Sequence, residues 1–571
     1  MKNKTKLLLS MLMVIPLCSC DLFLNNSSSN SSTKSESTSE NSSLNSSSIS
    51  NSSSSSSLNE DSSSVLTSSS SSSEASSSIE IEETVTLNIL ELNDIHGYVY
   101  ESGNNTSKNM SNIAYYVNQI RGKKEYDNVV LIANGDTFQG TAFSNLSHGK
   151  SVVNVMNKMN FDMMGIGNHE FDWGLDEVLK LWDGNKDNGE ANFPLINGNV
   201  RDSNNGNKLV GEDNLLDNIL PYAIVDKAGI KVGLISYIGD QTNSICQNKF
   251  GSYYIDCYGD KDASFLRNVE SQAKKVKEEG ADIIVLNIHE GNSSGVDGLY
   301  YNNAFASLKD NDGNYLIDAV INGHTHTNQS GKISRSNGAD LPIVQAGSYC
   351  NYIGQIDLEY NRTTKKVTSV ECKTVRNSSY SSDSIVKNTI DTEYAIIEPL
   401  ISKKLAKCVS SYVERSTLGY WTAGIMKQYS GSDVAFINTG GIRSTGNIEY
   451  GTNITMKELY EVNPFDNSLV YSKVRGDELK SFYNRNETNY YFNPDFDVNE
   501  IDANKTYNLL TIDYVYYSTY FRNCFKNIEE IKIDTLCARD LMVKDLEAHT
   551  SGEIDLNSTD YQIERNIFPV I

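Results

Sequence analysis

The chain has 571 residues, enough for two or three domains, and a formal net charge of -24 at pH 7. This charge and a pI near 4.8 argue against a nucleic-acid backbone or an anionic membrane surface as a partner of the folded part. We therefore expect no nucleic-acid polymer as a partner. A nucleotide in a locally cationic pocket is not excluded, because a bound metal can supply positive charge.

The N-terminus has the pattern of a secretory signal. Lys2, Lys4 and Lys6 precede an apolar run from Leu7 to Leu17 that is too short for a stable membrane span. The run ends in "LCSC", which resembles the cleavage box of bacterial lipoproteins and implies that Cys20 is lipidated. Residues 1–20 are therefore predicted to be a lipoprotein signal peptide, with the mature protein anchored to the outer face of the bacterial cell membrane. An ordinary signal peptide with chance cysteines is the alternative.

Residues 21–83 are rich in Ser and Asn and have very few apolar side chains. Such a stretch cannot bury enough apolar surface to offset the entropy of ordering it. We predict a disordered tether between Cys20 and the folded part.

From residue 84 onward, apolar runs alternate with amphipathic stretches. Helices are predicted at 110–124, 150–160 and 263–280, and strands at 86–92, 128–134, 161–167, 281–288, 315–321 and 341–347. This alternation indicates a layered α/β domain over 84–375. Residues 386–408 look like one connecting helix, which Pro399 could bend, in a linker assigned to 376–405. A second α/β or α+β domain is predicted over 406–571.

Polar residues follow five of the predicted strands. They are Asp94 and His96, then Asp136, then Asn168 and His169, then His289, and finally His324 and His326 in "INGHTHTN". Because ligands of α/β sheets gather at the carboxyl ends of strands, we expect these side chains to meet at one place.

The chemistry of this set favours a metal site. The ligand atoms are nitrogen and oxygen without sulfur, which suits Zn, Mn, Fe or a similar divalent ion. The set is too large for one tetrahedral ion, whereas two ions sharing one carboxylate fit it. Taken singly, Asp94 or Asp136 would more often be a turn residue and His289 a buried structural histidine. Taken together and in order, they favour two divalent metal ions.

The same residues resemble the calcineurin-type metallophosphoesterases. The matching blocks are Asp94-x-His96, Gly135-Asp136, Gly167-Asn168-His169-Glu170, His289 and Gly323-His324-x-His326. The longer "GNHEFDWG" resembles the 5′-nucleotidase branch, which includes UDP-sugar hydrolases, and the resemblance covers about residues 85–571. It implies an α/β fold, in which a layered αββα sandwich is joined by a helix to a second, substrate-binding domain.

The resemblance also implies roles for individual residues. Asp94, His96, Asp136 and His326 would hold one metal ion, and Asp136, Asn168, His289 and His324 the other, with Asp136 bridging. His169 would not be a ligand but would stabilise charge on the phosphoryl group or the leaving oxygen. Asp172 would orient the ring of His169.

The second region resembles the same branch less completely. In "INTGGIR", Asn438 and Arg443 would contact the substrate, and in "EVNPFDN", Phe465 and Asn467 would stack on and contact the base. Tyr514 falls where a second stacking aromatic is expected, but the Gly-Gly-Asp-Gly stretch that should follow it is absent. Tyr412 stands where a further substrate arginine is expected, with Arg415 nearby.

These features predict a cell-surface hydrolase with two metal ions that removes phosphate from nucleotides by attack of a metal-bound hydroxide. Hydrolysis of UDP-sugar pyrophosphate or of 2′,3′-cyclic nucleotides is the alternative within the same site, and the missing Asp favours it. An adhesin or binding lipoprotein on an inactive phosphatase fold is the non-enzyme alternative. The tether suits that alternative, but the complete ligand set argues against it. The expected partners are a nucleotide or nucleotide-sugar substrate and, through the lipid anchor, the membrane.

Overall fold

The first part of the folded chain is built on two facing β-sheets, seen in a computed structural model that describes residues 83–100, 110–122, 127–187, 189–212, 218–241, 244–257, 263–377 and 381–566. One sheet has the strand order β16-β15-β1-β2-β3-β4-β7 and the other β13-β14-β12-β11-β9-β8. Strands β1 to β4 and β7 run parallel, as do β9, β11, β12 and β14. The parallel runs bring the carboxyl ends of several strands to one edge of each sheet.

The strands of these two sheets have the following bounds: β1 Thr84–Leu92, β2 Val129–Asn134, β3 Met163–Gly165, β4 Leu195–Ile196, β7 Ile219–Leu220, β8 Tyr222–Lys227, β9 Ile230–Ile238, β11 Ile283–His289, β12 Ala319–Ile321, β13 Asn328–Ser334, β14 Asp340–Ala346, β15 Tyr352–Asn361 and β16 Lys366–Arg376. A small side sheet contains β5 Val200–Asp202, β6 Lys208–Leu209 and β10 Tyr253–Ile255.

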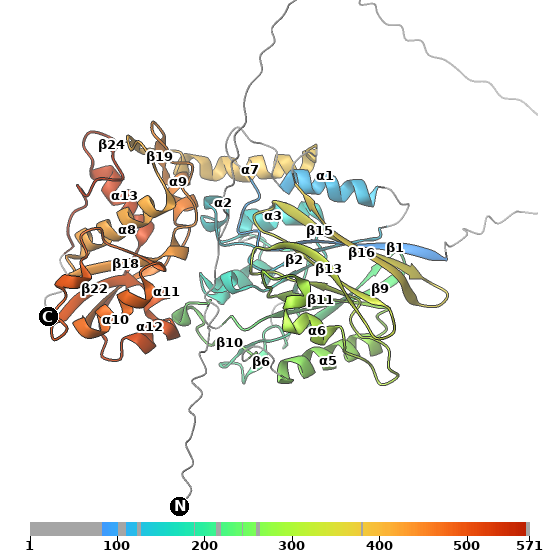
Figure 1. The fold of residues 1–571 in the computed structure, drawn as a ribbon. Coiled ribbons are helices and arrows are strands. Elements are labelled where there is room, and N and C mark those ends of the chain that lie inside the picture. Colours follow the sequence, from blue (N-terminus) through green and yellow to red (C-terminus); the bar gives the residue numbers. More distant parts are fainter. Residues whose placement is uncertain are drawn as a thin grey trace, which may run out of the picture. The chain divides into compact units, whose positions relative to one another are not determined.

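Side chains alternate between the two faces of each strand, so each strand contributes to two hydrophobic clusters. In β1, Leu87 and Ile89 belong to a cluster between the two sheets, whereas Leu90 and Leu92 belong to a cluster beneath the helices. Each fully buried side chain of this kind stabilises the fold by roughly 1.5–3 kcal/mol. Helices α1 (Met110–Arg121) and α3 (Lys150–Met159) lie over one sheet, and α5 (Ala263–Glu278) and α6 (Tyr300–Phe305) over the other (Figure 1). The predicted αββα sandwich is confirmed.

The second part of the folded chain has its own core around the five-stranded sheet β21-β18-β22-β20-β23. A three-stranded sheet of β19, β17 and β24 lies in the same part. The strands are β17 Lys404–Cys408, β18 Val434–Asn438, β19 Asn453–Thr455, β20 Ser468–Arg475, β21 Tyr490–Phe492, β22 Thr506–Ile512, β23 Glu529–Cys537 and β24 Glu553–Ile554. The helices are α8 Arg415–Ser430, α9 Met456–Val462, α10 Gly476–Asn486, α11 Asp513–Tyr516, α12 Thr519–Cys524 and α13 Ala538–Ala548. This is the second α/β domain that the sequence predicts.

Helix α7 (Ser384–Ile401) connects the two parts and begins where Asp383 accepts hydrogen bonds from the backbone of Ile385 and Val386. The predicted helix over 386–408 is too long, because Lys404–Cys408 is strand β17 and pairs with β19 and β24. All described residues belong to one compact unit, Glu83–Ile571. Within it, Asn145 donates to the carbonyl of Pro464 at 2.7 Å and Asn248 to Asp513 at 3.3 Å.

The predicted signal peptide, Cys20 and nearly all of the predicted tether lie outside the described residues. Among the residues that are described, no helix combines the length and apolarity that a membrane-spanning segment requires.

Candidate metal centre

The carboxyl ends of five parallel strands deliver the predicted ligand residues to one place. Asp94 and His96 follow β1, Asp136 follows β2, Asn168 and His169 follow β3, His289 ends β11, and His324 and His326 follow β12. All of them except His169, His324 and His326 are buried, and those three are partly exposed. The structure therefore brings together all seven predicted metal ligands and His169.

The backbone at this edge adopts an uncommon conformation. Five of the predicted ligands have φ in the left-handed region: Asp94 (50°), His96 (50°), Asp136 (48°), His324 (70°) and His326 (55°). Non-glycine residues rarely adopt it, and it costs of order 1–3 kcal/mol at each position. At Gly135, also left-handed at 68°, a Cβ would lie 2.6 Å from the amide nitrogen of Gly167 and 2.8 Å from Nδ1 of His289. Only glycine allows the loops after β2 and β3 to approach this closely.

The ligand atoms form three overlapping groups in which every atom lies within 4.8 Å of the others. One group is Asp94, His96 and His326, and another is Asp136, His289 and His324. In the first, Nε2 of His326 is 3.4 Å from Oδ1 of Asp94 and 3.1 Å from Nε2 of His96.

The second group meets the first at Asp136. Its Oδ2 is 3.2 Å from Nε2 of His289 and 3.8 Å from Nε2 of His96. Nδ1 of His324 is 2.9 Å from Oδ1 of Asn168. Asp136 thus lies between the two groups, as a shared ligand must.

Backbone carbonyls fix the orientation of two histidine rings. Nδ1 of His96 is 2.8 Å from the carbonyl oxygen of Gln139, and Nδ1 of His289 is 2.8 Å from that of Asn134. A ring that donates from Nδ1 keeps Nε2 as a lone-pair atom facing the centre of the cluster. The amide side chain of Asn93, which the sequence analysis did not single out, donates to Asp94 and to the carbonyl of Gly347.

Two buried polar atoms test whether a cation fits here. Oδ1 of Asp94 and Nε2 of His289 are fully buried and make no hydrogen bond within the described residues, although His326 Nε2 lies 3.4 Å from the first atom and Asp136 Oδ2 lies 3.2 Å from the second. Leaving such atoms without a partner costs roughly 1–3 kcal/mol each, so folded proteins rarely tolerate it. Both atoms face other nitrogen and oxygen ligands, which is the donor set of a divalent metal ion. The residues present therefore fit a divalent cation.

His169 lies beside the cluster. Its Nδ1 is 2.8 Å from Oδ2 of Asp172, and its backbone amide donates to Oδ1 of Asp136 at 2.8 Å. Burial alone would lower the pKa of His169, but the carboxylates of Asp172 and Asp136 outweigh burial and raise the pKa to about 9. His169 also forms a third group with His96 and Asp136. Geometry alone therefore leaves a ligand role open to it, while the pairing with Asp172 is the one the sequence predicts.

The buried carboxylate of Glu170 shapes the loops that carry these ligands. Its oxygens accept from the backbone amides of Asp136 at 2.8 Å, Thr137 at 2.8 Å and Gly167 at 2.7 Å. Glu170 thereby ties the loop after β2 to the loop after β3.

The C-terminal part brings two predicted substrate residues to this centre. Nη2 of Arg443 is 3.3 Å from Nε2 of His169. The ring of Phe465 stacks on the His169 ring with 5.8 Å between the ring centroids. The guanidinium of Arg443 lies 5.0 Å from the centroid of the Phe465 ring. These contacts place a cation and a flat apolar surface next to the same histidine.

The other predicted substrate residues also lie in the C-terminal part of the chain. Asn438 ends β18, Asn467 precedes β20 and Tyr514 lies in α11, all partly exposed, so their roles stay predictions. Tyr412 is 65 % exposed and bonds to Glu414. Arg415 instead donates to the carbonyls of Ile442 and Thr439, and so braces the loop that carries Arg443.

Sequence reasoning missed Tyr349. Its ring is 5.1 Å from the His326 ring and 5.5 Å from the His96 ring, and it too has a left-handed φ of 57°. The signal was available, because Tyr349 follows β14 in the same way that the ligands follow their strands.

Comparisons with known proteins agree with this architecture. Residues 87–328 match the calcineurin-like phosphoesterase family, and residues 401–496 match the 5′-nucleotidase C-terminal domain. The chain is 28 % identical over 445 residues to endonuclease YhcR of Bacillus subtilis, covering 73 % of this chain and 34 % of that protein. The chain thus spans about a third of that relative's length.

The matches to two further proteins cover a larger share of those proteins. Snake venom 5′-nucleotidase of Crotalus adamanteus is 25 % identical over 446 residues, covering 70 % of this chain and 69 % of that protein. The structure of a 5′-nucleotidase precursor from Thermus thermophilus superposes with a TM-score of 0.64 at 18 % identity, covering 85 % of this chain and 100 % of that one. The latter likeness shows a shared fold.

Proposed function

We propose that this chain, a calcineurin-like phosphoesterase with a 5′-nucleotidase C-terminal domain, is a metal-dependent hydrolase that removes phosphate from nucleotides. The observation that carries the proposal is the convergence of seven residues with nitrogen or oxygen ligand atoms, two of which, Asp94 Oδ1 and His289 Nε2, are fully buried and make no hydrogen bond within the described residues. The relative from Crotalus adamanteus, named a 5′-nucleotidase, supports nucleotides as the substrate class.

The ligand groups support two metal ions. Asp94, His96 and His326 would hold one, and Asn168, His289 and His324 the other, with Asp136 between them. A pair of divalent ions, when bound, neutralises phosphate charge and makes a water molecule acidic enough to act as the nucleophile. Zn, Mn and Fe all suit this donor set.

The chain's own residues then position and stabilise the phosphoryl group. His169, held by Asp172, and the guanidinium of Arg443 lie at the same edge of the cluster. Such groups stabilise the negative charge that develops on phosphoryl and leaving oxygens. Phe465, stacked beside them, provides a flat surface for a base.

The location of the enzyme is part of the proposal. The N-terminus supports export and lipid attachment, because basic residues and an apolar run precede Cys20. A Ser-rich and Asn-rich tether follows Cys20. A lipid-anchored enzyme at the cell surface would meet extracellular nucleotides. Globomycin treatment of expressing cells, or Cys20→Ala, should release or mislocalise the protein; unchanged membrane attachment would contradict lipidation.

The test of the central proposal combines metal analysis with turnover. Purified protein should contain close to two divalent ions per chain and release phosphate from AMP, and chelation should abolish release until metal is restored. A protein that binds no divalent ion after soaking, or that hydrolyses AMP equally well without metal, would refute it.

A further inference from the structure

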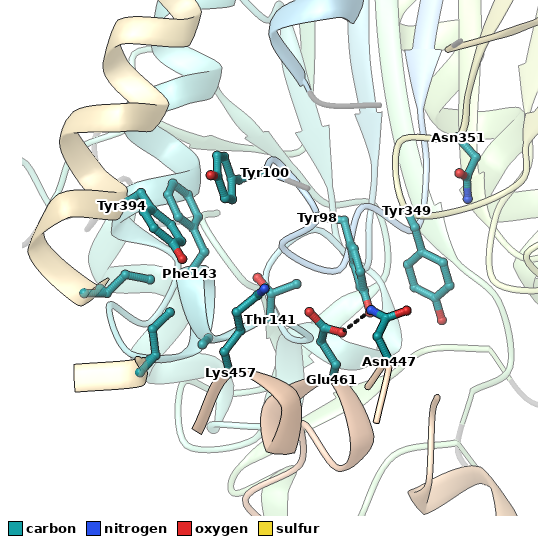
Figure 2. Close-up of a pocket in the computed structure, with 13 residues that line it drawn as sticks. Tyr98, Tyr100, Thr141, Phe143, Tyr349, Asn351, Tyr394, Asn447, Lys457 and Glu461 are labelled. Atoms are coloured by element: carbon teal, nitrogen blue, oxygen red, sulfur yellow. Dashed lines mark hydrogen bonds between the residues drawn. The ribbon is translucent and has the colours of Figure 1, made fainter. Parts of the chain in front are cut away.

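A cavity of about 250 Å³ lies where the first part of the folded chain, α7 and α9 meet (Figure 2). Among the described residues, its lining includes none of the predicted metal ligands and none of the predicted substrate residues. A cavity of this size is smaller than the roughly 300–1,000 Å³ of sites for drug-sized ligands, so it suits a single ring with a short polar end. The proposed hydrolysis of nucleotides does not use this space.

Aromatic rings form two groups on the wall of the cavity (Figure 2). In one group, Tyr98 and Tyr349 pack against each other with 4.6 Å between the ring centroids. In the other, Tyr100 packs against Tyr394 of α7 at 4.5 Å, and Phe143 lies nearby. Rings of this kind favour contact with flat apolar groups, and their faces also attract organic cations.

Two side chains of opposite charge line the cavity from one face of α9. Lys457 and Glu461 are four residues apart in this helix, so they lie one helical turn apart on the same face. The amide of Asn447 donates to Oε2 of Glu461 at 3.3 Å and so helps to fix the position of the carboxylate (Figure 2). Burial raises the pKa of Tyr98 and of Tyr394, and the charge of Glu461 contributes to both shifts. The carboxylate is therefore close enough to act on both aromatic groups.

This combination of groups favours a ligand that carries both charges. A purely apolar ligand would take the charged groups of Lys457 and Glu461 out of water without a partner. A ligand with only a positive charge would be repelled by Lys457, and one with only a negative charge by Glu461. An α-amino acid has an ammonium group next to a carboxylate, which matches two opposite charges one helical turn apart. A large apolar side chain on that amino acid would then pack against the aromatic rings.

We propose that the cavity between Tyr98, Tyr394 and Glu461 binds an α-amino acid with an aromatic or large aliphatic side chain. The ammonium group of the ligand pairs with Glu461 and its carboxylate with Lys457. Its side chain lies between the two groups of aromatic rings. This site is built from different residues than the metal centre, so the inference does not depend on whether the chain hydrolyses nucleotides.

Calorimetry on the metal-loaded protein tests the site with four probes. L-phenylalanine carries the ring and both charges, phenethylamine lacks the carboxylate, 3-phenylpropionate lacks the ammonium group, and glycine lacks the ring. Glu461→Gln should weaken L-phenylalanine and phenethylamine about tenfold and should not weaken 3-phenylpropionate. Lys457→Met should weaken L-phenylalanine and 3-phenylpropionate about tenfold and should not weaken phenethylamine. Each residue is thus matched to one charge of the ligand.

Matched variants and the glycine probe supply the controls. Glu449→Gln and Lys505→Met remove the same charges at exposed residues outside the cavity lining and should leave every affinity unchanged. Glycine chelates metal ions as L-phenylalanine does, so equal affinity for the two would place the amino acid at the metal centre and overturn the proposal.

Two other results would also overturn the proposal. One is that the unmodified protein does not bind L-phenylalanine. The other is that the two cavity variants weaken all three ring-containing probes equally, or none of them, while metal content and the midpoint of thermal unfolding stay unchanged. Phosphate release from AMP does not enter this comparison, so failure of the proposed function would leave the test of the amino-acid site intact.

Discussion

Replacement of Phe465 by Ala tests whether the aromatic surface beside His169 recognises a base. The ring lies 5.8 Å from the His169 ring and under the Arg443 guanidinium at 5.0 Å, and it is partly exposed. The backbone is held independently, because Asn145 donates to the carbonyl of Pro464 and Arg539 to the carbonyls of Asn463 and Phe465. Removal of the ring should therefore leave the loop in place.

The expected loss follows from the stacking free energy. A base stacked on an aromatic side chain is stabilised by about 1–3 kcal/mol, which corresponds to about a 5- to 150-fold lower kcat/KM for AMP. Glycerol 2-phosphate has no base and should lose about threefold or less. Phe465→Tyr keeps the flat ring and should retain most of the activity on AMP.

The assay is steady-state phosphate release from both substrates at saturating metal. Phe496, a partly buried phenylalanine that stacks on Phe492 in the C-terminal core, supplies the comparison variant Phe496→Ala. If Phe465→Ala lowers kcat/KM equally for AMP and glycerol 2-phosphate, the ring supports catalysis or folding and does not recognise the base. If neither substrate is affected, the base binds elsewhere.

Three further outcomes follow from the metal centre. His324→Ala should remove metal and abolish turnover, whereas His148→Ala, at an exposed position, should change neither; two metals and full activity in His324→Ala would contradict the assignment. His169→Ala should keep its metals while kcat falls about 10²- to 10⁴-fold, and loss of metal would make His169 a ligand. Gly167→Ala puts a Cβ 2.3 Å from Oδ1 of Asp136, so calorimetric metal affinity should fall about 10- to 100-fold; an unchanged affinity would mean that the loop relaxes freely.

Much of the metal centre could be predicted because the relevant signals are local in sequence. Each apolar run that forms a parallel strand is followed directly by its ligand, as His324 and His326 follow β12. Parallel strands place the ligands of each sheet at one edge of that sheet. The packing of the two sheets then brings the two sets of ligands together.

The position of Tyr349 after β14 could be read from the sequence, but its contacts with the metal ligands could not. Its neighbours His96 and His326 lie 253 and 23 residues away along the chain, and the contacts depend on the parallel pairing of β12 with β14 and on the pairing of β1 with β15. Local sequence does not specify which strands become neighbours. The same limitation applies to Arg415, whose side chain bonds to the carbonyls of Thr439 and Ile442.

The predicted connecting helix was too long because residues 402–408 contain no residue that typically ends a helix. Pro399 lies in the last turn of α7 and the helix ends at Ile401, two residues beyond it. The segment Lys404–Cys408 becomes a strand through its partners β19 and β24. β24 begins at Glu553, so this pairing is set by contacts from the far end of the chain.

The left-handed backbone at five ligand positions needs support from the buried strands that precede it. Such conformations persist only when the surrounding structure determines them fully, and together they cost several kcal/mol. Here Asp94, Asp136 and His324 each follow a strand whose side chains are almost wholly buried between or beneath the layers. Burial of those strands offsets the strain, and the strained turns aim side chains from separate strands at one point. The sandwich thus acts as the frame that keeps mutually repelling carboxylates and mutually crowded imidazoles close enough together to bind cations.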